Sequence, residues 1–401
     1  MIVVHRAACI VLLTFGLAGC SILANTADDL RNSTAGKPPY PANADAKRLY
    51  DTLAVADLHS DALLSPRDLT QLSRQGHLDI PRLQAARVRI QTMTQPTFSP
   101  YCPKGDGCTE RPNLIGLWAV VSSWPPKTWF DHQQRALYYS DRLSDLAARS
   151  GGRLAFTKSS AELRALLDGN DPTAIAAVLG VEGDEALAGD VRFVQRLAVA
   201  GYRVFAIVHQ ADNDAGGSST GVAKGGLTPF GRDVLAAADK SGMIVDLAHA
   251  SDRTIDDAAA YPLHRPPIVS HTGLTSICKS PRNIGDQEVR NVVKAGGLIG
   301  VGFWDVVLCM GDRNDPRDYA GKIAATMLKV AALSREVKPS EAYDHVALGS
   351  DFEGWVNEGF DVSGLVLIVE ALQRAGVSDA DIAKIMGGNY RRFLLDYLPP
   401  H

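Results

Sequence analysis

The sequence has no excess of charge of either sign and few long apolar runs. Its 401 residues carry 41 Lys and Arg against 45 Asp and Glu, which gives a formal net charge of −4. This balance provides no general attraction for nucleic acid or anionic lipid. A hydrophobic content of 46% is sufficient for a buried core, so a disordered chain is excluded. A polytopic membrane protein is also excluded, because it needs several apolar runs of about 20 residues.

The clearest apolar run, residues 7–17, lies at the N-terminus and is too short to span a bilayer. Arg6 precedes it, and Leu17-Ala18-Gly19-Cys20 follows, which resembles the lipobox of bacterial lipoproteins. The pattern predicts a signal peptide at residues 1–19, removed to leave a lipidated Cys20. Ser21 in place of Asp favours the outer membrane, facing the periplasm. The alternative is an ordinary secretory signal with an incidental cysteine.

The sequence contains only six cysteines, of which Cys9 would leave with the signal peptide and Cys20 would be acylated. The remaining four residues, Cys102, Cys108, Cys278 and Cys309, form an even set in an oxidising compartment. Three pairings are possible. Closure of Cys102 with Cys108 around a Lys-Gly-Asp-Gly turn would leave Cys278 for Cys309. The alternative is four free, buried thiols.

Short runs rich in Val, Ile and Leu recur along the chain from about residue 50 and alternate with helical patterns. Continuous apolar runs favour parallel strands that are buried on both faces. We predict strands at Leu53–Asp57, Val88–Thr92, Ile175–Val181, Arg203–Val208, Met243–Leu247, Pro267–Ser270, Leu298–Phe303 and Val346–Ser350. Helices are expected at 160–167, 230–241 and 320–337, and Ser378 is expected to cap another.

Eight strands alternating with helices predict an α/β fold of the (β/α)8 TIM-barrel type. An open doubly wound sheet is the alternative, but no Gly-x-Gly-x-x-Gly follows the first strand. We expect residues 51–398 to form one barrel with an insertion at about 95–132. Residues 20–50, which include Pro38, Pro39 and Pro41, would form the lipidated N-terminus and a tether.

Polar residues directly follow six of the predicted strands. They are His59 with Asp61, Glu182, His209, His249, His271 and Asp351. In a barrel these positions converge at the C-terminal mouth, where active sites lie. Histidines and carboxylates without thiolates suit Zn²⁺ or another divalent ion. His59 and Asp61 could bind one ion, His249 and His271 a second, and Glu182 could bridge the two.

The other histidines fit simpler interpretations. We expect His77, His132, His264 and His401 to be solvated, and His345 to be structural because it precedes the last strand. Asp57 and Asp246 lie inside strand ends. They are candidates for hydrogen-bonded groups that support the ligands.

Several segments together resemble the membrane (renal) dipeptidase family, which are binuclear zinc peptidases on an amidohydrolase-like barrel. The resemblance covers roughly residues 52–397. It rests on Asp57-Leu-His-Ser-Asp61, His77-Leu-Asp-Ile-Pro-Arg-Leu83, Gly180-Val-Glu-Gly183, Gly226-Leu-Thr-Pro-Phe-Gly231, Gly242-Met-Ile-Val-Asp-Leu-Ala-His-Ala-Ser251, Ser270-His271, Pro281-Arg-Asn283, Gly349-Ser-Asp-Phe-Glu-Gly354 and Gly387-Gly-Asn389.

The resemblance implies a role for each matching residue. His59 and Asp61 would bind one zinc, His249 and His271 the other, and Glu182 with a hydroxide would bridge them. Asp351 would act as the acid and base, and His209 would steady the oxyanion. Arg282 would hold the carboxylate of the substrate; without the resemblance we would place Arg282 in a surface salt bridge. The cysteine pair of the family matches Cys278 and Cys309.

The sequence departs from the family at three places. Asp184 and Glu185 replace a Gly-His pair, and Glu353 replaces an Asp. After the seventh predicted strand the family often carries a Tyr that helps hold the carboxylate, for which Phe303–Cys309 offers no clear equivalent. These changes affect the expected side-chain preference of the enzyme rather than its chemistry.

The sequence therefore predicts a lipid-anchored zinc dipeptidase that acts on dipeptides with a free C-terminal carboxylate, including those with a C-terminal D-residue. One rival is a related amidohydrolase that acts on N-acyl amino acids, β-lactams or other amides. A second rival is a non-catalytic binding lipoprotein. A homodimer is possible, as family members often form one.

Overall fold

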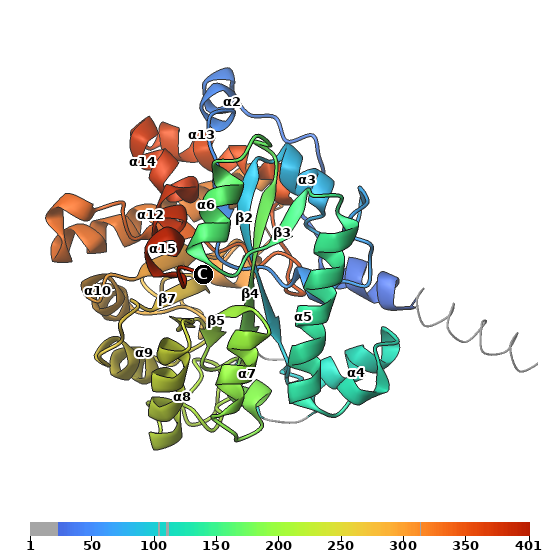
Figure 1. Ribbon diagram of the computed structural model, residues 1–401. Helices are drawn as coiled ribbons and strands as arrows, with labels where there is room; N and C mark the ends of the chain where they lie inside the picture. The colour runs from blue at the N-terminus through green and yellow to red at the C-terminus, as the bar shows by residue number, and fades with distance from the viewer. Residues whose placement is uncertain (1–22, 103–104, 110–111, 313) are drawn as a thin grey trace, which may run out of the picture.

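Eight parallel strands close into a barrel in this computed structural model, which describes residues 23–102, 105–109, 112–312 and 314–401 (Figure 1). The ring order is β1-β2-β4-β5-β6-β7-β8-β9, and it closes where β1 pairs with β9. The strands are β1 (Val55–Asp57), β2 (Val88–Pro96), β4 (Ile175–Glu182), β5 (Tyr202–Ala206), β6 (Ile244–Asp246), β7 (Ile268–Thr272), β8 (Leu298–Val301) and β9 (Val346–Leu348). The predicted (β/α)8 fold is confirmed, and each predicted strand overlaps a barrel strand.

Two features of the sheet differ from the sequence expectation. A ninth strand, β3 (Leu154–Phe156), pairs with β4 outside the ring. It is three residues long and half exposed, so it lacks the buried apolar run that marked the other strands. Strand β2 continues to Pro96, into the segment assigned to the insertion, because polar Thr94 and Gln95 are buried against β4 there.

Helices surround the barrel and begin where the sequence provides caps (Figure 1). They are α2 (Ala44–Tyr50), α3 (Ile80–Ala85), α4 (Leu114–Val121), α5 (His132–Arg149), α6 (Ser160–Leu167), α7 (Phe193–Val199), α8 (Pro229–Lys240), α9 (Asp252–Ala259), α10 (Asp286–Lys294), α11 (Asp305–Leu308), α12 (Pro316–Val337), α13 (Val366–Arg374), α14 (Asp379–Ala383) and α15 (Asn389–Tyr397). Ser159 forms a capping box with Glu162 at the start of α6. Ser378 caps α14 as predicted.

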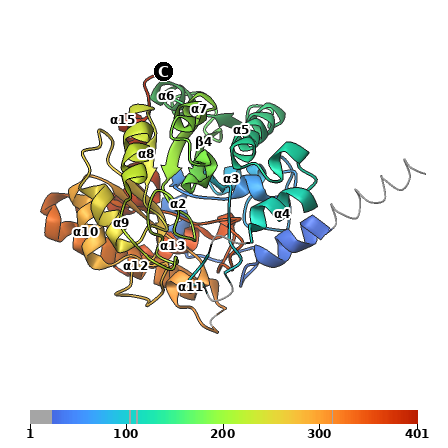
Figure 2. The same ribbon diagram turned by 90° about the horizontal axis from the view of Figure 1, so that it is seen from below.

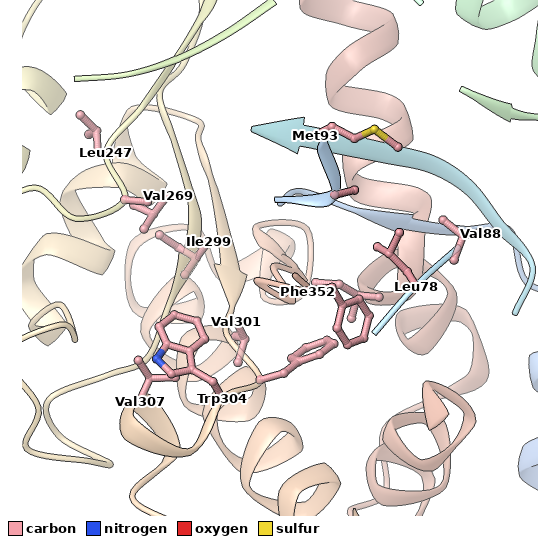
Figure 3. Packing of buried hydrophobic residues seen from close by; sticks show 14 of the residues in the cluster. Leu78, Val88, Met93, Leu247, Val269, Ile299, Val301, Trp304, Val307 and Phe352 are labelled. Carbon is pink, nitrogen blue, oxygen red and sulfur yellow. The ribbon is translucent and has the colours of Figure 1, made fainter. Parts of the chain in front are cut away.

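The core has two layers that follow the alternation of side chains along each strand. In β4, Ala176 and Val178 belong to the cluster inside the barrel, whereas Ile175 and Ala177 belong to the larger cluster beneath the helices. Figure 3 shows part of this outer layer, with Phe352 near Leu78. In this alternation Glu182 shares the inward phase of Ala176 and Val178. The end of β4 therefore places a carboxylate inside the mouth of the barrel.

The C-terminal helix α15 closes the opposite end of the barrel. Tyr390, Phe393 and Leu394 pack with the inner cluster, and the Tyr390 hydroxyl lies 2.6 Å from Thr92 Oγ1. Figure 2 shows α15 beside α6, in agreement with the hydrogen bond from the Ser160 amide to the Pro399 carbonyl. This end is apolar and sealed, so the open end is the one that carries the polar residues.

Both expected disulfides are present, one between Cys102 and Cys108 and one between Cys278 and Cys309. The first closes a loop in the segment between β2 and α5. The second joins the loop after β7 to the end of α11. The pairing by local closure is confirmed, and the alternative of four free thiols is excluded.

The segment expected to be a tether makes specific contacts with the barrel. Residues 23–31 are helical, and Asp28 is buried and accepts a hydrogen bond from Arg67 Nε at 3.2 Å. Residues 34–36 then run beside the loop after β9. These contacts leave fewer residues for a tether than the composition suggested. Cys20 and the signal peptide at 1–19 lie outside the described residues, and no described helix is long and apolar enough to cross a membrane.

Candidate active site

Seven polar side chains from six strand ends lie together at the open end of the barrel. They are the predicted residues His59, Asp61, Glu182, His209, His249, His271 and Asp351, each less than a tenth exposed. Their ligand-type atoms form three overlapping groups that could each hold a cation. The structure therefore brings together the complete set that the sequence pattern selected.

The first group lies at the end of β1. His59 Nε2 is 3.5 Å from Asp61 Oδ2 and 3.5 Å from Asp351 Oδ1. The predicted i, i+2 relation between His59 and Asp61 thus places both side chains at one point. Asp351 follows β9 and approaches them from the neighbouring strand.

The second group is centred on Glu182. Its Oε1 lies 3.1 Å from His249 Nε2 and 3.7 Å from His271 Nε2, and its Oε2 lies 3.4 Å from His209 Nε2. Glu182 and His271 also form a group with His59. Glu182 is therefore the one carboxylate that reaches both halves of the site.

The donor atoms of these groups fit a divalent cation. His59 Nε2, Asp61 Oδ1 and Glu182 Oε1 are buried without a hydrogen-bond partner in the described part of the chain. Leaving such groups unpaired is costly unless another partner is bound. His249 Nε2 and His271 Nε2 face each other at 3.0 Å. Burial lowers the pKa of both rings, so both are neutral and can act as ligands.

The electrostatics of the pocket also favour a positive ion. Burial alone would lower the pKa of His59, but the negative charges of Glu182 and Asp61 outweigh it and raise this pKa to about 10. Burial raises the pKa of Glu182 well above its usual range. Both shifts show that the carboxylates lack compensating positive charge, which a bound divalent ion supplies.

Buried hydrogen bonds hold the ligand-bearing backbone in place. Asp57 accepts from the Ser350 amide at 2.9 Å and from the Gln91 side chain at 2.9 Å. Asp246 accepts from the Ser270 amide at 2.9 Å, and the Ser270 hydroxyl lies 2.9 Å from His271 Nδ1. Asp57 and Asp246 thus support their neighbours, as the sequence suggested for residues within strand ends.

Two residues of the group have left-handed backbone conformations. His249 has φ = 64° and Asp351 has φ = 67°. This region is uncommon for residues other than Gly, and such strain collects at functional sites because surrounding contacts must hold it. Asp and His adopt this region more often than most residues other than Gly, but nothing in the local sequence predicted it at these two positions.

Arg282 lies at the edge of the site and is 7% exposed. Its Nη2 donates to the His271 carbonyl at 3.0 Å, while the buried Nη1 has no partner in the described residues. Burial lowers the pKa of Arg282 to about 10, so the guanidinium stays charged at neutral pH. The surface salt bridge considered for this residue is not formed, and a charged donor remains for an anionic group.

Trp304 is a site residue that the sequence analysis did not identify. Its ring centre lies 5.6 Å from the Arg282 guanidinium carbon and 5.7 Å from the His271 ring. It follows β8, in the segment where no equivalent of the family Tyr was found. A large aromatic residue directly after a strand was the only available signal.

A cavity of about 400 Å³ opens in front of these groups. Asp61, Glu182, His209, His249, Arg282 and Asp351 line one wall, which we call the strand-end wall. The remaining lining residues, which we call the loop wall, are Cys102, Gly105, Cys108, Gln210, Thr220, Trp304, Asp305, Val306, Gly354, Trp355, Val356 and Asn357. The volume suits a ligand of a few residues.

The histidines outside the site differ in how far their side chains are buried. The expectation that His77 is solvated is wrong, because it is fully buried between the Glu353 amide and the Ser33 carbonyl. His264 is exposed and hydrogen-bonded to Asp239, and His132 is half-buried. His345 is buried, with Nδ1 2.7 Å from the Gly297 carbonyl, as expected of a structural residue.

Comparison with known proteins identifies the family. A sequence model of the membrane dipeptidase family (Peptidase family M19) matches residues 43–396. The chain belongs to this family. It is 30% identical to dipeptidase verJ of Clonostachys rogersoniana over 326 residues, which is 80% of this chain and 76% of that protein.

Solved structures share the fold. A family M19 metallopeptidase called dipeptidase AC aligns with a TM-score of 0.69 at 21% identity, over 87% of this chain and 100% of that one. A metallopeptidase from Rhodobacter sphaeroides, liganded with a phosphinate mimic of the dipeptide L-Ala-D-Ala, aligns at 0.66 and 22% identity, with the same coverage. The protein is thus a metallo-dipeptidase of this family, and its cluster of His, Glu and Asp lies at the open end of the barrel.

Proposed function

We propose that this dipeptidase binds two zinc ions and hydrolyses dipeptides with a free C-terminal carboxylate, including those that end in a D-residue. The observation that carries the proposal is the position of Glu182. Glu182 belongs to two groups of possible metal ligands in the strand-end wall of the cavity. The charged Arg282 lines the same cavity.

The residues divide between two ions by their positions. His59 and Asp61 would hold one, His249 and His271 the other, and Glu182 would contact both. Two such ions, when bound, polarise a carbonyl and lower the pKa of a water molecule. The protein fixes the ligands before binding, because the carboxylates of Asp57 and Asp246 accept hydrogen bonds from the Ser350 and Ser270 amides, and the Ser270 hydroxyl lies beside the His271 ring.

Asp351 is the candidate acid and base. Its carboxylate lies beside His59 and faces the cavity. Burial raises the pKa of Asp351 to about 8, which brings it into the range where a carboxyl group can accept a proton and return it to the leaving amine.

His209 would act at the carbonyl oxygen of the scissile bond. Its Nδ1 donates to the Phe98 carbonyl at 3.0 Å, which leaves Nε2 pointing at Glu182. Burial lowers the pKa of His209 to about 3, so the free ring presents a lone pair at Nε2. To donate a hydrogen to an oxygen that gains negative charge, the neutral ring would adopt the tautomer with its hydrogen on Nε2, and it would give up the hydrogen bond from Nδ1 to Phe98.

Arg282 would bind the carboxylate of the substrate through its unpaired Nη1. In a dipeptide a single residue separates the scissile carbonyl from the terminal carboxylate, so a carboxylate held at Arg282 would place the last peptide bond beside the strand-end wall. A C-terminal D-residue is supported by the dipeptide mimic bound in the Rhodobacter sphaeroides structure. Fixing the carboxylate and the carbonyl leaves the last side chain free to point toward the loop wall.

The test is a substrate panel combined with zinc quantitation. L-Ala-L-Ala, L-Ala-D-Ala, the corresponding tripeptides and N-acetyl amino acids would be assayed with the purified protein. We expect cleavage of both dipeptides, little of the tripeptides, and two zinc ions per chain. Cleavage of the N-acetyl amino acids alone would replace the dipeptide proposal by the amidohydrolase alternative.

We also propose that the protein is held at the bacterial outer membrane, on the periplasmic side, by acylation of Cys20. The lipobox-like sequence supports this location. A Cys20→Ala variant should move the protein from the membrane fraction to the soluble fraction. Retention of that variant in the membrane fraction would refute the anchor. A homodimer stays a prediction, to be tested by sedimentation.

A further inference from the structure

The loop after β9 contains three residues other than glycine with a left-handed backbone conformation. Asp351 and Glu353 have φ = 67°, and Trp355 has φ = 60°. Such a residue is destabilising unless surrounding contacts hold it. Asp351 belongs to the strand-end wall and Trp355 to the loop wall, so this loop connects the two sides of the cavity.

Each of the three strained residues donates its amide hydrogen to a specific acceptor. The Asp351 amide donates to the His59 carbonyl at 3.3 Å, and the Glu353 amide to His77 Nδ1 at 3.0 Å. The Trp355 amide donates to Asn32 Oδ1 at 2.8 Å. The first two acceptors belong to the barrel and its first loops. The third belongs to the N-terminal segment, more than 300 residues away in sequence.

Asn32 is itself held in place. It is 2% exposed, and its Nδ2 donates to Asp28 Oδ1 at 3.0 Å. Asp28 accepts from Arg67 Nε at 3.2 Å, and Arg67 also pairs with Glu353 at 2.6 Å. The Arg31 guanidinium lies 4.8 Å from the centre of the Trp355 ring. The amide acceptor for Trp355 is therefore part of a buried network rather than a loose surface contact.

The same segment continues along the loop. The Ser33 carbonyl accepts from the Glu358 amide at 3.0 Å and lies 3.1 Å from His77 Nε2, and the Ala35 amide donates to the Glu358 carbonyl at 2.7 Å. Glu358 also forms a β-bridge with Trp304. A continuous set of contacts thus joins the N-terminal segment, through residues 353–359, to Trp304 beside Arg282.

We infer that Asn32 is a positioning residue for substrate binding, because it fixes Trp355 and thereby the loop wall of the cavity. Asn32 does not line the cavity and is not among the metal-ligating groups. Its loss should loosen the wall that, if the proposed function holds, contacts the side chains of the substrate. The metal-ligating side chains at the strand ends keep the hydrogen bonds of Asp57, Asp246 and Ser270, which Asn32 does not contact. The effect should therefore fall on KM rather than on kcat or on metal content.

The test compares two Asn→Ala substitutions in the holoenzyme. Asn43 caps α2 and accepts from the Ala46 amide at 2.8 Å, the same length as the Asn32 contact, but its helix packs away from the cavity. Asn32→Ala should raise KM for L-Ala-D-Ala about tenfold, with kcat within about twofold and zinc unchanged, as expected when the Trp355 amide loses its buried acceptor. Asn43→Ala should leave KM unchanged.

Two further measurements separate positioning from stability. Hydrogen exchange of the amides in 352–360 should accelerate in Asn32→Ala and not in Asn43→Ala. The exchange variant Asp28→Asn with Asn32→Asp keeps an acceptor for Trp355 and a donor–acceptor pair between the two positions. It should restore KM to within about threefold of the wild type, which general destabilisation would not predict.

The outcomes are distinguishable. An unchanged KM in Asn32→Ala overturns the inference, and so does a parallel loss of kcat, zinc and thermal stability in both alanine variants. If Asn32→Ala does not fold, Arg31→Ala serves instead, because Arg31 is exposed. This variant should raise KM two- to fivefold through loss of the contact with Trp355. An unchanged KM in Arg31→Ala would then refute the inference.

Discussion

The two walls of the cavity are built in different ways. The strand-end wall consists of side chains whose positions are set by the barrel. It includes buried atoms without a hydrogen-bond partner in the described residues, such as His59 Nε2 and Glu182 Oε1, which could act as metal ligands. The loop wall consists of segments held by a disulfide, by a β-bridge at Glu358 and by the N-terminal segment. The first wall is suited to chemistry and the second to selection of substrates. Variants in each wall should therefore change different kinetic constants.

The largest effect is expected from Glu182→Gln, which removes the charge shared by both halves of the strand-end wall. Zinc binding and dipeptidase activity should fall together, the latter by about a thousandfold or more, corresponding to about 4 kcal/mol. Metal analysis and single-substrate kinetics would show this. Glu341→Gln, at the partly exposed residue near His345, is the matched control. Retention of full zinc content in Glu182→Gln would contradict a bridging role.

Asp351→Asn should reduce kcat by about 10²- to 10⁴-fold, because it removes a proton acceptor while keeping the shape of the side chain. Zinc content should be retained, which distinguishes this variant from Glu182→Gln. The measurement is kcat for L-Ala-D-Ala at constant metal loading. Turnover equal to that of the wild type would exclude Asp351 as the acid and base.

Arg282→Lys tests carboxylate recognition by Arg282, which lies beside Trp304 of the loop wall. A lysine keeps the charge but loses the planar donor pair and the stacking with Trp304. KM for a free dipeptide should rise about 10- to 100-fold, whereas the weaker cleavage of the dipeptide amide should change little. Arg290→Lys, in an exposed ion pair of α10, is the control. An equal effect on both substrates would show that Arg282 does not recognise the carboxylate.

The smallest kinetic effects are expected from the disulfides. Cys278 and Cys309 are 31 residues apart and Cys102 and Cys108 only 6, so loop-closure entropy predicts losses of about 4 and about 2 kcal/mol on replacement by Ser. Only the shorter bridge has both cysteines in the loop wall. In denaturant unfolding, loss of the Cys278–Cys309 bridge should have the larger effect. In KM, loss of the Cys102–Cys108 bridge should have the larger effect. The same ranking in both measurements would mean that the loop wall plays no part in selection.

Much of the fold and of the strand-end wall could be predicted because both follow from local patterns. Buried strands are continuous apolar runs, and the residue after each run must lie at the mouth of a barrel. Glu182 and His271 were found in this way. The short, half-exposed β3 was missed, and so was the extension of β2 through buried polar residues. In both cases tertiary pairing with β4 compensates for a weak local signal.

The loop wall could not be predicted, because its contacts join residues far apart in sequence. The pattern around His77 suggested a solvated ring, yet Ser33 and Glu353 bury it from opposite sides. Trp304 was not identified as a site residue, since nothing local showed that Arg282 would lie beside it. The N-terminal segment was assigned to a tether because it is polar and proline-rich, which local composition cannot distinguish from a segment that packs.

The sequence by itself determined the barrel, the cluster of histidines and carboxylates at its mouth, and the family. The apolar runs of the strands and the positions of the ligands after them are local properties, so they can be recognised in the linear sequence. Only the tertiary structure decided which wall faces those ligands and what holds that wall in a strained conformation. The physical reason is that contacts such as the hydrogen bond from the Trp355 amide to Asn32 join residues more than 300 positions apart, and no local pattern records such a contact.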